Sequence, residues 1–150
     1  MGHIHLASRG DHLHETMLVK AWTQMAEGGD LERLWFPQGK TISQALECWL
    51  GNLTYIAFDE SGIWGISWFE EWMGHQGIWS FWLRPDCRRT KKGRELCLDM
   101  VERGKAIFQS VLTFTDNPKM LSLWKKLGFE LKGELEVGSK PCWIGQLKGG

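Results

Sequence analysis

The stretch that decides the fold runs from Gly77 to Phe129 and reads GIWSFWLRPDCRRTKKGRELCLDMVERGKAIFQSVLTFTDNPKMLSLWKKLGF. An apolar strand, Ile78 to Leu83, is followed by a basic turn with one glycine and by a long amphipathic helix, Arg89 to Phe108. A second apolar strand, Val111 to Thr115, comes next. A strand–helix–strand crossover joins parallel strands with a right-handed connection, so the sequence predicts one parallel pair here.

The basic turn reads Arg88-Arg89-Thr90-Lys91-Lys92-Gly93 and leads into that helix. The first N–H groups of a helix have no partner inside the helix, and the helix dipole is positive at this end. A solvated helix start is the plain interpretation, but four cations there oppose the dipole unless an anion is bound. The turn therefore indicates a site for an anionic group such as a pyrophosphate.

Composition narrows the classes of function. A chain of 150 residues fits one domain, residues 1–150, and its formal net charge is zero. Nucleic-acid and membrane-surface binders carry excess Lys and Arg, so the charge argues against both classes. The four cysteines are scattered, which suits a reduced, cytoplasmic protein. No secretory signal pattern and no apolar run of about 20 residues appears, so we expect no membrane span.

The remaining periodicity predicts a mixed fold of the α/β (α+β) class. We expect a mostly antiparallel central sheet that contains the β-α-β crossover and is flanked by helices. Outside the crossover we expect a helix capped by Asp11 that runs to about Met25, a second capped by Thr41 or Ser43 that ends at Gly51, and a third from Met120 to Leu127. The other expected strands are Ile4 to Leu6, Leu53 to Phe58, Ile63 to Phe69, Glu130 to Val137 and Pro141 to Leu147.

This order of elements resembles that of the GNAT (N-acetyltransferase) superfamily over nearly all 150 residues. In the family's acyl-CoA loop, an Arg or Gln precedes two glycine positions. Arg88 matches the first residue, Lys91 stands at the first glycine position and Gly93 at the second. Asn117, Trp124 and Gly128-Phe129 match a second motif, in which an Asn precedes a helix with a Tyr and then Gly-Phe. The short, tryptophan-rich chain is also similar to GNAT-like proteins encoded by bacteriophages, found in the host cytoplasm or the virion.

The resemblance implies an N-acyltransferase that moves an acetyl group from acetyl-CoA to a primary amine of a small molecule or protein. It implies two splayed strands, with the pantetheine arm paired to backbone at Phe81, Trp82 and Leu83. It places the pyrophosphate on the backbone from Arg89 to Arg94, which includes Thr90, Lys91, Lys92 and Gly93. Asn117 and Trp124 complete the donor site, and pairing through sheet edges would give a homodimer.

Two departures from the family pattern bear on activity. Lys91 replaces a glycine that lets phosphate approach the backbone, although its ammonium can pair with phosphate. Trp124 replaces the tyrosine whose hydroxyl protonates the leaving thiolate, and an indole N–H is no general acid at neutral pH. These departures keep a second hypothesis open, a non-catalytic GNAT-like phage protein with a structural or host-interaction role.

Acyl transfer to an amine needs a base, and the candidates are Glu70, Glu71 and His75, with ordinary surface roles as the alternative. Strand alternation places Glu70 on the face of Ile66 and Trp68, and Glu71 on the face of Gly65 and Ser67. Glu71 is the favoured base, because small neighbours leave room beside a thioester. His3, His5, His12 and His14 lack further ligands, so we expect no metal site.

Overall fold

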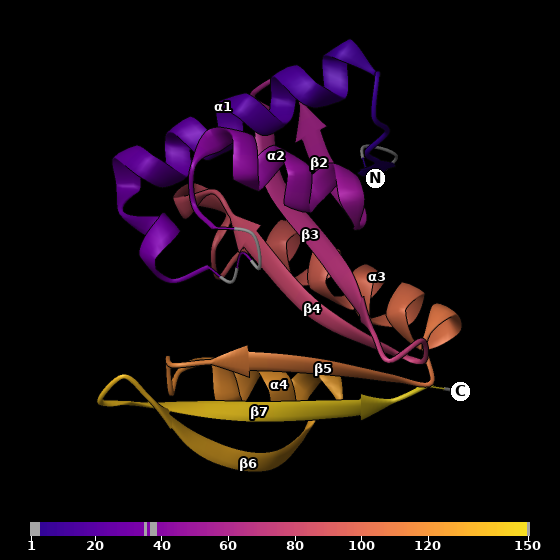
Figure 1. Cartoon of the computed structure of the whole chain (residues 1–150), viewed down its shortest axis with the longest axis vertical. Helices are drawn as coiled ribbons and strands as arrows, with labels where there is room; N and C mark the ends of the chain where they lie inside the picture. The colour runs from indigo at the N-terminus through magenta and orange to yellow at the C-terminus, as the bar shows by residue number, and fades with distance from the viewer. Residues whose placement is uncertain (1–3, 35, 37–38, 150) are drawn as a thin grey trace. The chain divides into compact units, whose positions relative to one another are not determined.

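The computed structural model describes residues 4–34, 36 and 39–149. In that part of the chain the helices are α1 (His12–Gly28), η1 (Asp30–Glu32), α2 (Ile42–Gly51), η2 (Pro85–Cys87), α3 (Lys91–Ile107) and α4 (Met120–Leu127), where η marks a 3-10 helix. The strands are β1 (Ile4–Leu6), β2 (Leu53–Asp59), β3 (Gly62–Trp72), β4 (Gln76–Leu83), β5 (Ser110–Thr115), β6 (Glu130–Val137) and β7 (Lys140–Lys148). Figure 1 shows them in chain order from indigo to yellow.

Local capping explains where the first two long helices begin. The Asp11 side chain accepts a hydrogen bond from the His14 backbone N–H at the start of α1. Thr41 and Gln44 form a reciprocal capping box at the start of α2. Gly29 and Gly128 adopt left-handed backbone angles directly after α1 and α4, which a glycine does without a steric penalty.

The strands form one seven-stranded, mostly antiparallel sheet in the order β1-β2-β3-β4-β5-β7-β6. The predicted crossover is confirmed, because β4 and β5 pair in parallel from Gln76 with Ser110 to Ile78 with Leu112. Strands β1, β2 and β3 pair antiparallel in sequence order, as do β5 with β7 and β7 with β6. The fold class expected from the sequence is therefore observed.

The chain divides into two compact units, and the first comprises Met1–Phe69 and Ser80–Leu96. Helices α1 and α2 lie together over its strands (Figure 1). Buried side chains of both helices, among them Leu18, Ala45 and Trp49, share one core with Ile66 and Trp68 of β3. On the opposite face of β3, the place of a Cβ on Gly65 lies 2.7 Å from Leu96 Cδ2, so the start of α3 covers that face.

The second unit comprises Glu70–Trp79 and Cys97–Gly150. Its strands β5, β7 and β6 lie side by side with α4 against them (Figure 1). The Trp79 and Phe129 rings stack at 5.8 Å, and Trp124 packs directly on the backbone of Gly145. The outer strand β6 exposes Leu131, Leu135 and Val137. Leu135 and Val137 share one face of the strand, and the register shift between Leu131 and Gly133 separates Leu131 from that face.

Some boundaries differ from those expected. Helix α3 begins at Lys91 rather than Arg89, because η2 and an extended turn take up the residues before it. Strand β3 continues to Trp72, so Glu70 and Glu71 lie inside the strand.

Most of the described tryptophans are buried in the core. Trp49 and Trp68 are fully buried and meet edge to face, whereas Trp72 is exposed, so these three do not line one aromatic slot. Trp35 lies outside the described residues.

Gly145 offers a test of the packing in the second unit. A Cβ at this position would lie 2.8 Å from Trp124 Cε3 and 2.9 Å from Cζ3, and a rigid indole ring cannot fold away. We expect Gly145→Ala to lower the free energy of unfolding by about 1–3 kcal/mol, the usual cost of overpacking. Urea denaturation measures this change.

Gly133 on β6 is the matched control, since a Cβ there meets no atom within 4 Å. We expect Gly133→Ala to leave the free energy of unfolding unchanged or to raise it by roughly 0.4–1 kcal/mol, because alanine lowers the conformational entropy of the unfolded chain. Equal losses for both variants would contradict the proposed contact between Trp124 and Gly145.

Candidate functional site

The basic turn is shaped by Thr90, which precedes α3. Its hydroxyl donates to the Cys87 carbonyl at 2.6 Å and accepts from the Gly93 N–H at 3.2 Å. The Arg94 N–H donates to the Thr90 carbonyl at 3.1 Å. Thr90 thus acts as the N-terminal cap of α3, and the amides of Gly93 and Arg94 are already used.

Four amides of the turn are left for a ligand. Within the described residues, the backbone N–H groups of Arg89, Thr90, Lys91 and Lys92 have no hydrogen-bond partner. Arg89, which carries the first of these amides, has a positive φ of 61°. Free amides at a helix start can bind an anion, and binding of an anion at this turn stays a prediction.

Gly93 is required by the backbone itself. A Cβ at residue 93 would lie 2.5 Å from the Cys87 carbonyl oxygen and 3.0 Å from Leu83 Cδ1. A carbonyl of the main chain cannot give way as a side chain can. The glycine therefore allows η2 to pack against the first turn of α3, in addition to any contact with a ligand.

Arg88, the first residue of the predicted loop motif, is bound to other parts of the protein. Its Nε donates to the Leu83 carbonyl at 2.9 Å, and its Nη2 donates to Asp30 Oδ2 at 2.8 Å. The sequence predicted a charge for the phosphate at this position, whereas the guanidinium is engaged within the protein. The sequence did not predict Asp30 as the partner of Arg88. The one feature near it in the sequence is the preceding helix-breaking pair Gly28-Gly29.

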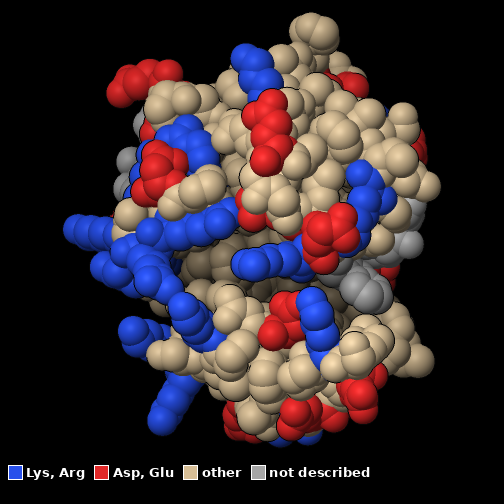
Figure 2. Space-filling view, turned by 90° about the vertical axis from the view of Figure 1, so that its left-hand side faces the viewer, with Lys and Arg blue, Asp and Glu red and all other residues tan. Residues whose placement is uncertain are grey.

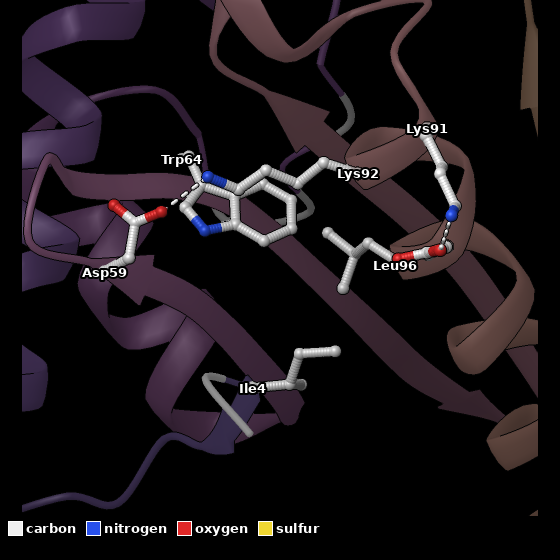
Figure 3. Close-up of a pocket in the computed structure, with 7 residues that line it drawn as sticks. Ile4, Asp59, Trp64, Lys91, Lys92 and Leu96 are labelled. Carbon is white, nitrogen blue, oxygen red and sulfur yellow. Dashed lines mark hydrogen bonds and ion pairs between the residues drawn. The ribbon is translucent and has the colours of Figure 1, made fainter. Parts of the chain in front are cut away.

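Lys92 is also engaged. Its ammonium forms an ion pair with Asp59 at 2.5 Å and lies 4.5 Å from the centre of the Trp64 ring (Figure 3). This arrangement lines a cavity of about 460 Å³. Its walls are Ile4, Asp59, Trp64, Lys91, Lys92, Glu95 and Leu96. The Trp64 indole N–H is buried without a hydrogen-bond partner among the described residues.

The cations that stay available are those on the outside of the turn. Lys91 is 84% exposed and forms only a long ion pair of 3.8 Å with Glu95, and Arg89 and Arg94 are exposed. Arg84 is held by Asp86, whose pKa the guanidinium lowers. Figure 2 shows Lys and Arg side chains gathered on part of one face with Asp and Glu among them, in keeping with zero net charge.

The strand end with the candidate bases belongs to the second unit. Glu70 is half-buried, and both Glu71 and His75 are exposed. The His75 carbonyl accepts from the Gln109 N–H, which fixes the turn between β3 and β4. The room that the sequence suggested beside Gly65, on the face that shares the parity of Glu71, is filled by Leu96 at that position.

Asn117 and Trp124 have clear packing roles. The Asn117 side chain accepts from the Lys119 N–H at 3.0 Å and its carbonyl accepts from the Met120 N–H, so it shapes the turn before α4. Trp124 is 2% exposed and supports β7. The segment expected to pair with the pantetheine arm lies at the end of β4. There Phe81 is half-buried, Leu83 is buried, and Trp82 is buried and donates a hydrogen bond to Asp30.

The cysteines carry no nucleophile signal. Burial raises the pKa of the Cys97 thiol to about 12, which keeps it protonated. Cys87 is buried under the turn. The described residues contain no group of three potential ligands that could hold a metal, and none of their helices is long and apolar enough to cross a bilayer.

Comparison with known sequences gives no match, either to a protein family or to a curated protein. Solved structures match over almost the whole length. An acetyltransferase of the GNAT family from Streptococcus pneumoniae has a TM-score of 0.75 at 19% identity, with 98% of each chain covered. The fold is that of the GNAT acetyltransferases.

Two further structures agree with this GNAT fold. Ribosomal-protein-alanine N-acetyltransferase from Brucella melitensis has a TM-score of 0.74 at 18% identity, covering 97% of this chain and 98% of that one. A Salmonella typhimurium protein solved with its cofactor acetyl-CoA has a TM-score of 0.70 at 13% identity, covering 97% and 92%. These identities show the fold, and the narrower likeness to phage proteins gains no support from them.

The Lys92–Asp59 pair predicts a dependence of stability on pH. The pKa of Asp59 lies well below its usual 3.8, because Lys92 and then Ser61 donate hydrogen bonds to the ionised carboxylate. A lowered pKa stabilises the fold above about pH 4, and this contribution is lost as the pH falls below that value. We expect Asp59→Asn to be less stable than wild type at pH 7, with the difference shrinking between about pH 4 and pH 2.

Urea unfolding at several pH values measures this difference. Asp99→Asn, which breaks the helical pair with Arg103, controls for the loss of one surface charge. A deficit of Asp59→Asn that stays constant down to pH 2 would show that the carboxylate charge does not stabilise this contact.

Proposed function

We propose that the chain is an N-acyltransferase that moves an acetyl group from acetyl-CoA to a primary amine. The observation that carries the proposal is the set of four unpartnered amides at Arg89 to Lys92, in the turn to which the family resemblance assigns the pyrophosphate of the donor. The three similar structures named above are described as acetyltransferases, one of them provisionally. That one, from Salmonella typhimurium, was solved with acetyl-CoA. Fold likeness alone does not fix a reaction, so the proposal depends on the turn.

The donor would be held by its pyrophosphate on those amides. Lys91 and Arg89 are exposed cations of the same turn and would add Coulomb attraction, while Arg88 and Lys92 hold the turn in place. Backbone at Phe81 to Leu83 is the proposed partner of the pantetheine amides. Asn117 and Trp124 are assigned to the donor only by their match to the family motif.

The chemistry needs one proton acceptor for the amine. An ammonium substrate loses a proton to a carboxylate, directly or through water, and the free amine attacks the thioester carbonyl carbon. The new C–N bond forms, the C–S bond breaks, and the thiolate of CoA leaves. The attacking nitrogen releases its second proton to water, and the thiolate takes a proton from water, because the indole at residue 124 cannot act as an acid. The carboxylate then returns the first proton to solvent.

Among the three candidate bases, Glu71 is the proposed one. It is exposed at the end of β3, so its carboxylate can exchange protons with solvent. Glu70 is half-buried and already interacts with another group. His75 lies in the turn beyond the strand and is the second alternative.

The donor site is tested by binding of CoA and acetyl-CoA, measured by calorimetry. We expect Lys91→Ala and Arg89→Asn to weaken binding about threefold to tenfold each, the scale of one exposed charge contact, and added salt to weaken it further. Asn is chosen at residue 89 because it tolerates a positive φ. Lys105→Ala, at the far end of the same helix, should bind as wild type does.

No detectable binding of CoA to the folded wild type would refute the enzyme. That outcome would favour the second candidate, a non-catalytic protein that kept the fold. The specific observations behind that candidate are Lys91 at a glycine position and Trp124 at a tyrosine position.

The base is tested by kinetics with a panel of amines. We expect Glu71→Gln to lower kcat/KM by about 10²-fold or more, the usual scale for a general base, and Glu70→Gln to retain most activity. The acidic limb of the pH–rate curve should disappear in Glu71→Gln. If that limb persists unchanged, the base is another group, and His75→Gln is the next variant to measure.

A further inference from the structure

Asp30 lies at the start of η1, directly after the left-handed Gly29. Its side chain is only 15% exposed, and its Oδ2 accepts two hydrogen bonds. One comes from the Trp82 indole N–H at 3.0 Å and the other from Arg88 Nη2 at 2.8 Å. A single carboxylate oxygen thus holds two residues that lie 52 and 58 positions later in the chain.

Arg88 extends the connection to a third residue. Its Nε donates to the Leu83 carbonyl while its Nη2 is held by Asp30. The end of β4 and the start of the basic turn are therefore fixed to the same point. The four unpartnered amides begin at the very next residue, Arg89.

The chemistry favours a carboxylate at residue 30 over other groups. Trp82 is 3% exposed, so its indole N–H needs a buried acceptor. The guanidinium of Arg88 is stabilised by a formal negative charge, and charge-assisted bonds are the stronger ones. Without the charge, Arg88 is free to leave the Leu83 carbonyl and turn to solvent.

We propose that Asp30 is the positioning residue of the acyl-donor site. It holds the pantetheine-pairing end of β4 and the pyrophosphate turn in register with each other. Asp30 itself touches no donor atom and acts through Trp82 and Arg88. This inference rests on the proposed function, because it assigns those two segments to one donor.

The first test compares CoA binding by folded variants. We expect Asp30→Asn to raise the Kd for CoA about tenfold, and Arg88→Gln to do the same. The double variant should lose no more than either single one, because both changes break one connection. Asp86→Asn is the matched control, since it removes an exposed carboxylate from η2 that pairs with Arg84, and its Kd should stay within twofold of wild type.

Thermal unfolding of each variant is measured together with its Kd for CoA. The two values distinguish a role of Asp30 in stability from a role in positioning the donor site. If Asp30→Asn lowers Tm yet binds CoA as wild type does, the positioning role is refuted. Additive losses in the double variant would refute it as well, because Asp30 and Arg88 would then act independently.

The second test does not depend on CoA. Hydrogen exchange in the free protein should show faster exchange of the Gly93 and Arg94 amides in Asp30→Asn and unchanged exchange in Asp86→Asn. If wild type binds no CoA, the proposed function fails and this exchange result alone decides whether Asp30 holds the turn. Unchanged exchange in Asp30→Asn would overturn the inference in either case.

Discussion

The burial of the Phe36, Trp49 and Trp68 rings is the contact on which the first unit depends. Phe36 stacks on Trp68 at 5.5 Å, and Trp49 meets both rings edge to face. Truncating a buried aromatic side chain typically costs about 3–5 kcal/mol, whereas a hydrogen bond to a charged group contributes about 1.5–3 kcal/mol. Aromatic packing therefore decides where α2 lies on the sheet, and the polar contacts of Asp30 adjust the turn within that frame.

The basic turn has an unusually high positive charge that the fold has to accommodate. Six consecutive residues carry four cations, which taken alone would repel one another and oppose the helix dipole. Two of them form close ion pairs, Arg88 with Asp30 at 2.8 Å and Lys92 with Asp59 at 2.5 Å, whereas Lys91 forms only the long pair with Glu95. The turn consequently presents fewer free charges than its sequence suggests, and its backbone amides become the more important donors.

The features that could be predicted from the sequence are the local ones. The cap at Asp11 and the helix Met120–Leu127 follow from neighbouring residues, and the order strand, helix, strand predicts the parallel pair of β4 and β5. For α2 the sequence offers Thr41 or Ser43 as the cap, and the structure has Thr41. The pairings that define the candidate site join residues far apart, such as Arg88 with Asp30, and no periodic pattern encodes them. The contact of Gly65 with Leu96 could not be predicted for the same reason. The small size of Gly65 suggested open space beside it, but the Leu96 side chain fills that space.

Two glycines of the second unit have a consequence for how the sequence can change over time. Gly145 leaves space for the Trp124 ring, and Gly77 leaves space for the Phe108 ring, with ideal Cβ positions 2.8 and 2.6 Å from ring carbons. A large ring at residue 124 fits only when residue 145 is a glycine, and a large ring at residue 108 fits only when residue 77 is a glycine. Mutational paths through this region are therefore ordered: the glycine must arise before the ring, and the ring must shrink before the glycine can be replaced.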